Sequence, residues 1–274
     1  MTNEHRVVLL GAGGRMGQAL IRGLLKKSVP GLRLAGAVDL WDCPARGQDA
    51  GRVAGVEEAG LEIGCDLVAA AKQADVIVDF SGAQGTTGNV PRCAEWRLPM
   101  IIGTTGLDAA GHTAIETAAR AIPIVHAPNM SLGVNLLLEL TRQAAEILRN
   151  RGYDVEVLER HHRYKKDAPS GTALSLGRAA AEGMGWSLQD VAKHGREGLS
   201  KTGRPEEQIG FHAIRGGDFI GDHTVLFAAD GECIELSHRA TDRDTFARGA
   251  LQAAAWVIGR PAGLYTMRDV LGLP

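Results

Sequence analysis

The sequence predicts an α/β protein with an N-terminal Rossmann-type parallel sheet and a second α+β domain built on a mixed or antiparallel sheet. Three observations lead to this fold class. Short apolar runs alternate with helical stretches in the first half, a glycine-rich turn follows the first run, and later strand candidates are joined by a hairpin and long loops. Alternating strands and helices are typical of a parallel sheet covered by helices, whereas a hairpin joins antiparallel strands.

Composition narrows the class of protein. The chain has 274 residues, of which 45% are hydrophobic and 23% charged, as expected of a water-soluble globular protein. Its net charge of −2 favours neither nucleic acid nor an anionic membrane as a partner. The four cysteines are scattered without a CxxC pair, so we expect no metal site and a reducing compartment. The apolar run Val7–Leu10 is too short for a signal peptide or a membrane span, and we predict a cytoplasmic protein.

The first half contains the pattern of a dinucleotide-binding domain, which we place at residues 1–129. Segments such as Met16–Lys27 and Leu107–Arg120 have helical spacing or composition and lie between apolar runs. The expected strands are Arg6–Leu10, Arg33–Val38, Asp75–Phe80, Met100–Ile102 and Ile122–His126.

The second half begins with an amphipathic helix and continues with strands. Ser131 can cap a helix whose apolar residues, from Leu132 to Ile147, fall on one face. Asp230-Gly231 is a strong signal for a two-residue hairpin. We predict a second domain over residues 130–240, with residues 241–274 packing back on the first. Its expected elements are strands at Tyr153–Glu159, Phe211–Arg215, His223–Ala229 and Glu232–His238, a short helix opening at Pro169–Thr172, and a final helix at Asp242–Ile258.

The glycine-rich turn directly follows the first strand. Such a turn lets the backbone approach a pyrophosphate, which the next helix meets with free N–H groups. Asp39 ends the second strand about 20 residues on, where an acid hydrogen-bonds the adenosine ribose. A tight turn without ligand, an ordinary loop acid and a surface Arg15 are the alternatives. The spacing departs from strict G-x-G-x-x-G, because the turn reads Gly11-Ala12-Gly13-Gly14-Arg15-Met16-Gly17.

Two later turns lie at the ends of expected strands of the same sheet. Ligands of open α/β sheets bind beyond the carboxyl ends of the strands. Small and hydroxyl residues there suit a nicotinamide ribose and carboxamide, although hydroxyl-rich turns are also common without a ligand. The two turns are Gly103-Thr104-Thr105-Gly106 and Ala127-Pro128-Asn129-Met130.

A basic segment follows the strand that we expect at Tyr153–Glu159. Residues 160–166 contain two histidines and four cationic residues, and Pro169 then suits a helix start. His, Lys and a helix N-terminus would together hold a compact dicarboxylate, and a histidine could donate a proton to carbon. A solvated charged face or a weak metal site are the alternatives. Neighbouring histidines on an extended strand point to opposite sides, which disfavours joint chelation.

These motifs together resemble the 4-hydroxy-tetrahydrodipicolinate reductase family, also called dihydrodipicolinate reductase, from Val7 to Leu271. The motifs are the glycine turn, Ile102–Gly106, the block Glu159–Ala173 and Met267–Leu271. The resemblance implies reduction of a cyclic imine dicarboxylate by NADH or NADPH, with loss of water, to tetrahydrodipicolinate in diaminopimelate and lysine synthesis. It also implies a homotetramer assembled through the sheet of the substrate domain, residues 130–240.

The resemblance assigns roles to individual residues. It implies that His161 is the general acid/base, that Lys165 is its partner in proton donation, and that His162, Gly171 and Thr172 bind the substrate carboxylates. The residues that it implies for the cofactor are Gly11, Ala12, Gly13, Gly14, Arg15, Met16, Asp39, Gly103, Thr104, Thr105, Ala127, Pro128, Asn129 and Met130.

The sequence departs from the family where the 2′-phosphate of NADPH would bind. Asp39 is followed by Leu40 instead of the frequent Arg, and the next basic residue is Arg46. The turn after Phe80 reads Ser81-Gly82-Ala83, without the frequent basic residue and Pro. We therefore predict that NADH is used at least as well as NADPH. Arg215-Gly216-Gly217 and Arg243 could complete the substrate site or be structural.

Two other functions are compatible with a Rossmann start. One is another two-domain NAD(P)-dependent amino-acid dehydrogenase, which would not need the His-His-x-x-Lys block. The other is a non-catalytic NAD(P)-sensing protein, which intact His161 and Lys165 disfavour.

Overall fold

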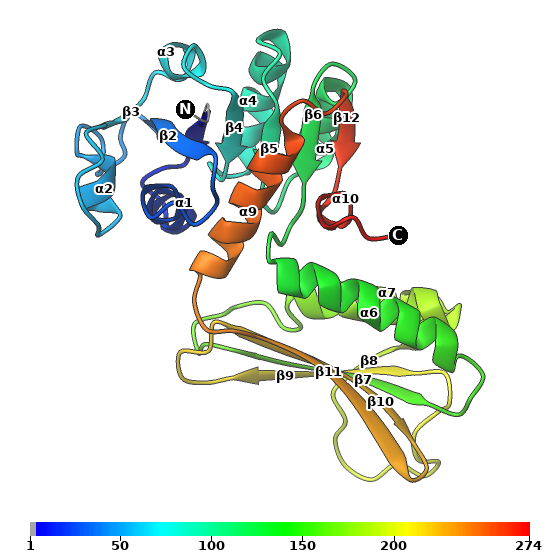
Figure 1. Cartoon of the computed structure of the whole chain (residues 1–274). Coiled ribbons are helices and arrows are strands. Elements are labelled where there is room, and N and C mark those ends of the chain that lie inside the picture. The colour runs from blue at the N-terminus through cyan, green and yellow to red at the C-terminus, as the bar shows by residue number, and fades with distance from the viewer. Residues whose placement is uncertain (1–3) are drawn as a thin grey trace. The chain divides into compact units, whose positions relative to one another are not determined.

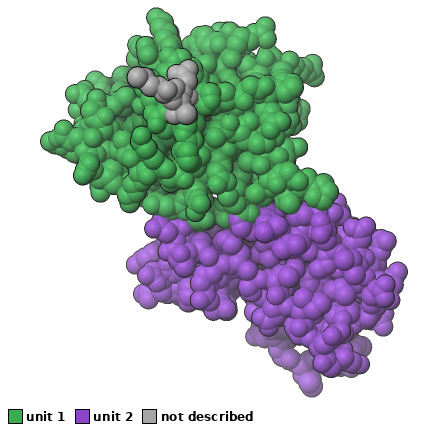
Figure 2. All heavy atoms as spheres, viewed as in Figure 1, with its two compact units in different colours: residues 1–132, 243–274 green, residues 133–242 purple. Residues whose placement is uncertain are grey.

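The computed structural model describes residues 4–274 (Figure 1). The chain divides into two compact units (Figure 2). Unit 1 comprises Met1–Leu132 and Arg243–Pro274, and unit 2 comprises Gly133–Asp242. Unit 1 is therefore assembled from both ends of the chain, and unit 2 is continuous. Across residues 4–274, no helix is both long and apolar enough to cross a membrane.

Unit 1 is built on a seven-stranded parallel sheet with the order β12-β6-β5-β4-β1-β2-β3. This confirms the predicted Rossmann-type sheet. Strand order reverses at β1, which has β2 on one side and β4 on the other, and ligands bind at such a switch point. The strands are β1 (His5–Leu10), β2 (Leu32–Val38), β3 (Ile63–Gly64), β4 (Val76–Asp79), β5 (Met100–Ile102), β6 (Pro123–His126) and β12 (Gly263–Tyr265).

Helices cover both faces of this sheet. Val7 and Leu9 of β1 point into a core that they share with α1 and α9, while Val8 and Leu10 point into a core shared with α4 and α5. Alternate strand residues face opposite sides, so an entirely apolar strand needs cover on both. The helices are α1 (Arg15–Leu25), α2 (Ala50–Val53), α3 (Leu67–Ala71), α4 (Ala83–Glu95), α5 (Ala109–Ala118), α9 (Asp244–Val257) and α10 (Met267–Leu271).

Unit 2 is built on a five-stranded mixed sheet with the order β11-β10-β7-β9-β8. Strand β10 is antiparallel to β11 and β7, while β7, β9 and β8 are parallel, which confirms the predicted mixed sheet. Helices α6 and α7 pack on one face of it. The elements are α6 (Leu132–Leu148), β7 (Asp154–His161), α7 (Gly171–Met184), α8 (Leu188–Val191), β8 (Ala192–His194), β9 (Ile209–Arg215), β10 (Gly221–Ala229) and β11 (Glu232–Ala240).

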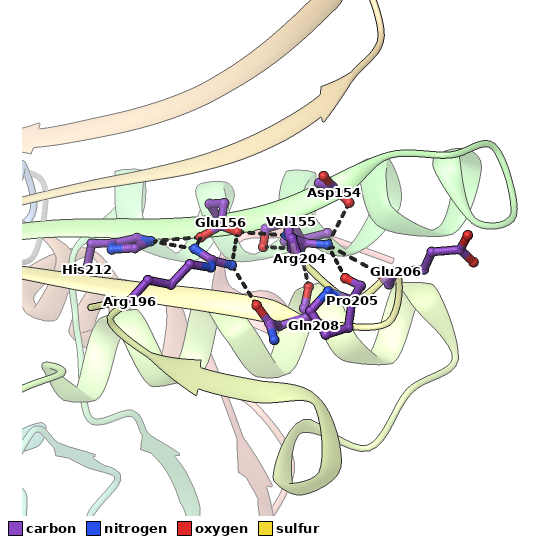
Figure 3. A network of polar contacts seen from close by, with 9 residues as sticks. All are labelled: Asp154, Val155, Glu156, Arg196, Arg204, Pro205, Glu206, Gln208 and His212. Carbon is purple, nitrogen blue, oxygen red and sulfur yellow. Dashed lines mark hydrogen bonds and ion pairs between the residues drawn. The ribbon is translucent and has the colours of Figure 1, made fainter. Parts of the chain in front are cut away.

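The opposite face of this sheet carries a polar network on Glu156 of β7 (Figure 3). Its carboxylate accepts hydrogen bonds from Arg196 (2.6 and 2.9 Å), Arg204 (3.0 Å) and His212 (2.8 Å). Burial alone would raise the pKa of Glu156, but these hydrogen bonds outweigh burial and lower the pKa to about 2. Arg196 also donates to Gln208, so the connection 195–208 is held on the sheet.

Candidate active site

The glycine turn of unit 1 is tied to β2 by its backbone. The N–H groups of Gly11 and Ala12 both donate to the carbonyl of Val38. Gly11 has φ +77°, and a Cβ on it would lie 2.6 Å from the carbonyl oxygen of Phe80. Only glycine combines that conformation with so close a backbone neighbour. The N-cap Gly14 makes no side-chain cap, so the start of α1 keeps N–H groups for an anion.

Gly17 explains the irregular spacing of the motif. A Cβ on Gly17 would lie 2.6 Å from Cα and O of Ala12, and nearer still to the carbonyl oxygen of Gly11. Helix α1 therefore approaches the turn most closely at Gly17, one residue later than the strict fingerprint places its third glycine. Gly17 therefore allows the close packing of helix on turn that the third glycine of the strict fingerprint provides.

Asp39 joins β2 to the glycine turn. Its Oδ2 accepts the Gly13 N–H at 2.7 Å, and its Oδ1 accepts the Leu40 N–H at 2.8 Å. Asp39 lines a pocket of about 250 Å³. The other lining residues include Gly11, Leu40, Trp41, Ser81, Asn89 and Arg92. Each carboxylate oxygen keeps a lone pair that a ribose hydroxyl could use.

A second pocket of unit 1, of about 410 Å³, is lined by residues of both predicted turns, 103–106 and 127–130. Thr104 is buried and accepts a hydrogen bond from the hydroxyl of Thr86 at 2.8 Å. A Cβ on Gly103 would overlap the ring of Phe80, so glycine at this position leaves room for that ring. The lining residues are Met16, Phe80, Gly82, Gly103, Thr104, Thr105, Pro128, Asn129, Met130 and Phe246.

The two pockets fit a dinucleotide. Phe80 and Gly82 line one of them and Ser81 the other, so the segment after β4 borders both. An acid placed for ribose hydroxyls lies in one pocket, and hydroxyl side chains lie in the other. The turn 11–14, which carries only the buried methyl group of Ala12, suits the pyrophosphate between them. Of the remaining predicted residues, Ala12 and Ala127 are buried, Gly13 is half-buried, and Gly14 and Arg15 are exposed.

The predicted catalytic histidine belongs to a buried cluster in unit 2. Strand β7 extends to His161, beyond the end at Glu159 that the alternating pattern predicted. Glu159 and His161 are therefore two residues apart on one strand and face the same side. Arg215 at the end of β9 pairs in register with His161. Glu159 accepts from His161 Nδ1 at 2.6 Å, from both terminal nitrogens of Arg215 at 2.7 Å, and from the Ser170 N–H at 2.9 Å.

These contacts fix the ionisation of Glu159 and the orientation of His161. Burial alone would raise the pKa of Glu159, but hydrogen bonds from His161, Arg215 and the Ser170 N–H lower it to about 2. A carboxylate only accepts, so Nδ1 of His161 carries the hydrogen of this contact, and Nε2 is the ring nitrogen that makes no contact with Glu159. A methyl group on Gly221 would lie 3.0 Å from Nε2, so glycine at this position leaves room beside that atom.

A second buried histidine adjoins the first. The rings of His223 and His161 lie 5.1 Å apart in a T-shaped arrangement. Burial lowers the pKa of His223 to about 3, and repulsion from His161 adds to this, so His223 is neutral at neutral pH. Its Nε2 lies 3.2 Å from Ser170 Oγ, which also accepts the Ala173 N–H and caps α7.

The remaining predicted residues surround the start of α7. Lys165 pairs with Asp167 at 2.9 Å. Nδ1 of His162 is buried and has no hydrogen-bond partner among residues 4–274, which suits contact with a ligand. Gly171 is exposed and Thr172 half-buried in the first turn of α7. A capped helix start flanked by cations can bind a carboxylate.

Both units match one family over nearly their whole length. Residues 5–130 match the family described as dihydrodipicolinate reductase, N-terminus, and residues 133–271 match its C-terminus. The chain belongs to the dihydrodipicolinate reductase family.

Relatives and a solved structure agree with this membership. The chain is 50% identical to the 4-hydroxy-tetrahydrodipicolinate reductase of Thiobacillus denitrificans and 47% identical to that of Anaeromyxobacter dehalogenans, over 98% of each chain. It is similar to the dipicolinate-bound dihydrodipicolinate reductase of Paenisporosarcina sp. TG-14, with a TM-score of 0.74 and 22% identity, covering 97% of this chain and 98% of the other. That last likeness shows the fold alone.

Several residues at these candidate sites were not predicted as site residues. Glu159 is two residues from His161, so extending the predicted strand by two residues could have placed both side chains on one face. Nothing local marks His223 as a neighbour of His161. Phe246 and Arg92 reach their pockets from α9 and α4. Phe80 and Ser81 follow a predicted strand, so the rule that ligands bind at strand ends could have found them.

Proposed function

We propose that this chain reduces 4-hydroxy-tetrahydrodipicolinate with a nicotinamide dinucleotide, giving tetrahydrodipicolinate and water, in diaminopimelate and lysine synthesis. Unit 1 would bind the dinucleotide and unit 2 the substrate. The observation that carries the proposal is His161, held through Nδ1 by buried Glu159 next to the capped start of α7. Relatives at about half identity over nearly the full chain bear this reductase name.

Substrate binding would use the first turn of α7. Its N–H groups at Gly171 and Thr172 would hold one carboxylate, supported by the positive end of the helix dipole. His162 would donate to a carboxylate through a ring nitrogen that has no hydrogen-bond partner among residues 4–274. Charge-assisted hydrogen bonds of this kind are about twice as strong as neutral ones.

Proton transfer would use His161. Loss of the 4-hydroxyl group as water would first leave a ring carbon–carbon double bond conjugated with the imine. When bound, the reduced dinucleotide would supply hydride to carbon four of this conjugated system, and the electron pair of the resulting enamine would take a proton at the adjacent carbon. His161 would give that proton from Nε2 and keep the hydrogen on Nδ1, which Glu159 accepts. Lys165 would assist as the neighbouring cation after exchanging its pairing with Asp167 for the substrate.

We propose that NADH serves at least as well as NADPH. Asp39 places a carboxylate where the ribose 2′ position is expected, and Leu40 adds no cation beside it. Arg92 of α4 lines the same pocket, so any use of NADPH would depend on this residue. Catalytic efficiencies with the two cofactors test the proposal, and a tenfold preference for NADPH contradicts it.

We also propose that the chain forms a homotetramer through the sheet of unit 2. Light scattering on the purified protein tests this, and a monomer at micromolar concentration contradicts it. The cytoplasmic location expected from the scattered cysteines stays a prediction.

A coupled assay tests the activity. The preceding synthase generates the substrate, and turnover is followed as loss of nicotinamide absorbance. His161→Gln and Lys165→Ala should each reduce kcat by on the order of 10²-fold or more, because each removes a group that moves a proton. Lys166→Ala, at the exposed neighbouring position, should keep the activity. Binding of the dinucleotide without turnover would favour the non-catalytic sensing protein. Turnover of an amino acid in place of this substrate would favour the amino-acid dehydrogenase.

A further inference from the structure

Glu159 is a buried carboxylate whose contacts extend to both parts of the proposed substrate site. Glu159 is only 1% exposed, so both of its carboxylate oxygens need protein partners. Oε2 accepts from His161 Nδ1 and from Arg215, and Oε1 accepts from Arg215 and from the Ser170 N–H. All four lone-pair directions of the carboxylate are therefore used.

We propose that Glu159, held in place by Arg215, is a positioning residue that fixes the tautomer of His161 and sets its place relative to the start of α7. This inference rests on the proposed function of His161 as the proton donor. A neutral histidine can carry its hydrogen on either ring nitrogen. Contact with Glu159 selects Nδ1–H, which keeps Nε2 directed to the reaction.

Arg215 completes this arrangement from a neighbouring strand. Its terminal nitrogens bind Glu159 and also donate to the carbonyl oxygens of Ile214 (2.8 Å) and Asp167 (2.6 Å). A two-pronged guanidinium–carboxylate pair has a fixed geometry that lysine cannot reproduce. Arg215 is thus used to hold Glu159. Of the two roles that the sequence left open for Arg215, substrate binding and structural support, these contacts favour structural support of the site.

The same carboxylate also touches α7. Ser170 donates its N–H to Glu159, while its side chain caps the helix through the Ala173 N–H at 3.2 Å. One group therefore contacts the proton donor and the helix start that would bind the substrate carboxylate. A displacement of Glu159 would move both together, and catalysis is sensitive to shifts of about 1 Å.

The groups around His161 come from several elements. His161 itself contacts Glu159 of β7 and His223 of β10. Arg215 of β9 binds Glu159, the Ser170 cap of α7 contacts His223, and Lys165 follows β7.

The decisive variant is Glu159→Gln, compared with Glu156→Gln as a matched control. Glu156 lies on the same strand and, like Glu159, binds arginine and histidine side chains, but it faces the other side of the sheet. Glu159→Gln should lower kcat by on the order of 10²-fold or more, since the orienting carboxylate of a serine-protease triad is worth about 10⁴. Affinity for NADH, measured by fluorescence, should stay within twofold in both variants.

Nitrogen-15 NMR of the His161 ring supplies a readout independent of turnover. We expect the Nδ1–H tautomer in the wild type and in Glu156→Gln, and a mixture of tautomers in Glu159→Gln. An unchanged tautomer, or kcat within threefold of wild type, overturns the proposal. If the wild type itself fails to reduce the substrate, the proposed function fails, while the tautomer still decides whether Glu159 positions His161.

Arg215→Lys keeps the test decisive should Glu159→Gln fail to fold. It retains the charge but gives up the two-pronged geometry, so Glu159 is held less firmly and a mixture of His161 tautomers is expected. The wild-type tautomer in Arg215→Lys contradicts the role given to Arg215.

Discussion

Replacing Gly17 by alanine should damage both the packing of α1 and the dinucleotide site. The new methyl carbon would lie 2.6 Å from Cα and O of Ala12, about 0.8 Å inside the 3.4 Å at which ordinary contact begins. Both obstacles are backbone atoms, which cannot rotate away as a side chain can. Helix α1 must therefore move outward from the turn, and its first N–H groups move with it.

The energetic cost follows from two opposing effects. Overpacking of a well-packed site costs about 1–3 kcal/mol, and rigid backbone on the opposing side places Gly17→Ala at the upper end. Alanine recovers about 1 kcal/mol over glycine within a helix. We expect a net loss of about 2 kcal/mol, together with at least a tenfold weaker affinity for NADH, since tenfold corresponds to about 1.4 kcal/mol.

Hydrogen exchange and fluorescence measure the two effects separately. Peptides from β1 and α1 should exchange faster in Gly17→Ala, and titration with NADH should give a raised Kd. Gly88→Ala is a matched control, because a Cβ on this glycine of α4 meets nothing within 4 Å. It should be neutral or stabilising by about 0.5–1 kcal/mol. Wild-type exchange and wild-type Kd in Gly17→Ala would refute the reasoning.

Three further outcomes are expected. Arg92→Ala should lower kcat/KM with NADPH about tenfold and leave kcat/KM with NADH within twofold. The control Arg120→Ala, at an exposed position after α5, should change neither value. Equal losses with both cofactors in Arg92→Ala would contradict this prediction. Glu156 has a pKa of about 2 in the folded state against an ordinary 4.5, so its stabilisation is complete above pH 4.5 and is lost as the pH falls toward 2. The free energy of unfolding of Glu156→Gln should therefore depend less on pH across that range than that of the wild type. Parallel curves of stability against pH for the two proteins would contradict this prediction. Ser170→Ala removes the cap of α7 and should lower the free energy of unfolding in urea by about 1 kcal/mol. An unchanged free energy of unfolding would mean that the cap contributes nothing.

The sheet of unit 1 could be predicted because each strand has a local signature. Apolar runs such as Val7–Leu10 are buried on both faces, and a continuous hydrophobic run between turns is visible without knowing its neighbours. Patterns of this kind do not show where a strand ends when its last residue is polar. The predicted strand therefore ended at Glu159, although the strand continues to His161, which is paired with Arg215.

The candidate site was predictable only where its residues are close in sequence. The glycine turn and the block around His161 are contiguous, so their spacing carries information. Arg92 reaches the pocket of Asp39 through the packing of α4, and Arg215 reaches Glu159 through strand pairing. Such neighbours depend on tertiary structure, which no local pattern encodes.

The assembly of unit 1 from both chain ends has a consequence for biosynthesis. A ribosome makes residues 1–132 first, but strand β12, which pairs with β6, and helix α9, which packs beside α1, leave it last. Until then β6 presents a bare edge, and the apolar side of α1 lacks the cover that Leu251 and its neighbours provide. Unit 2 is continuous and can fold earlier. A nascent chain that stops at Asp242 would thus carry a finished second unit and an aggregation-prone first one.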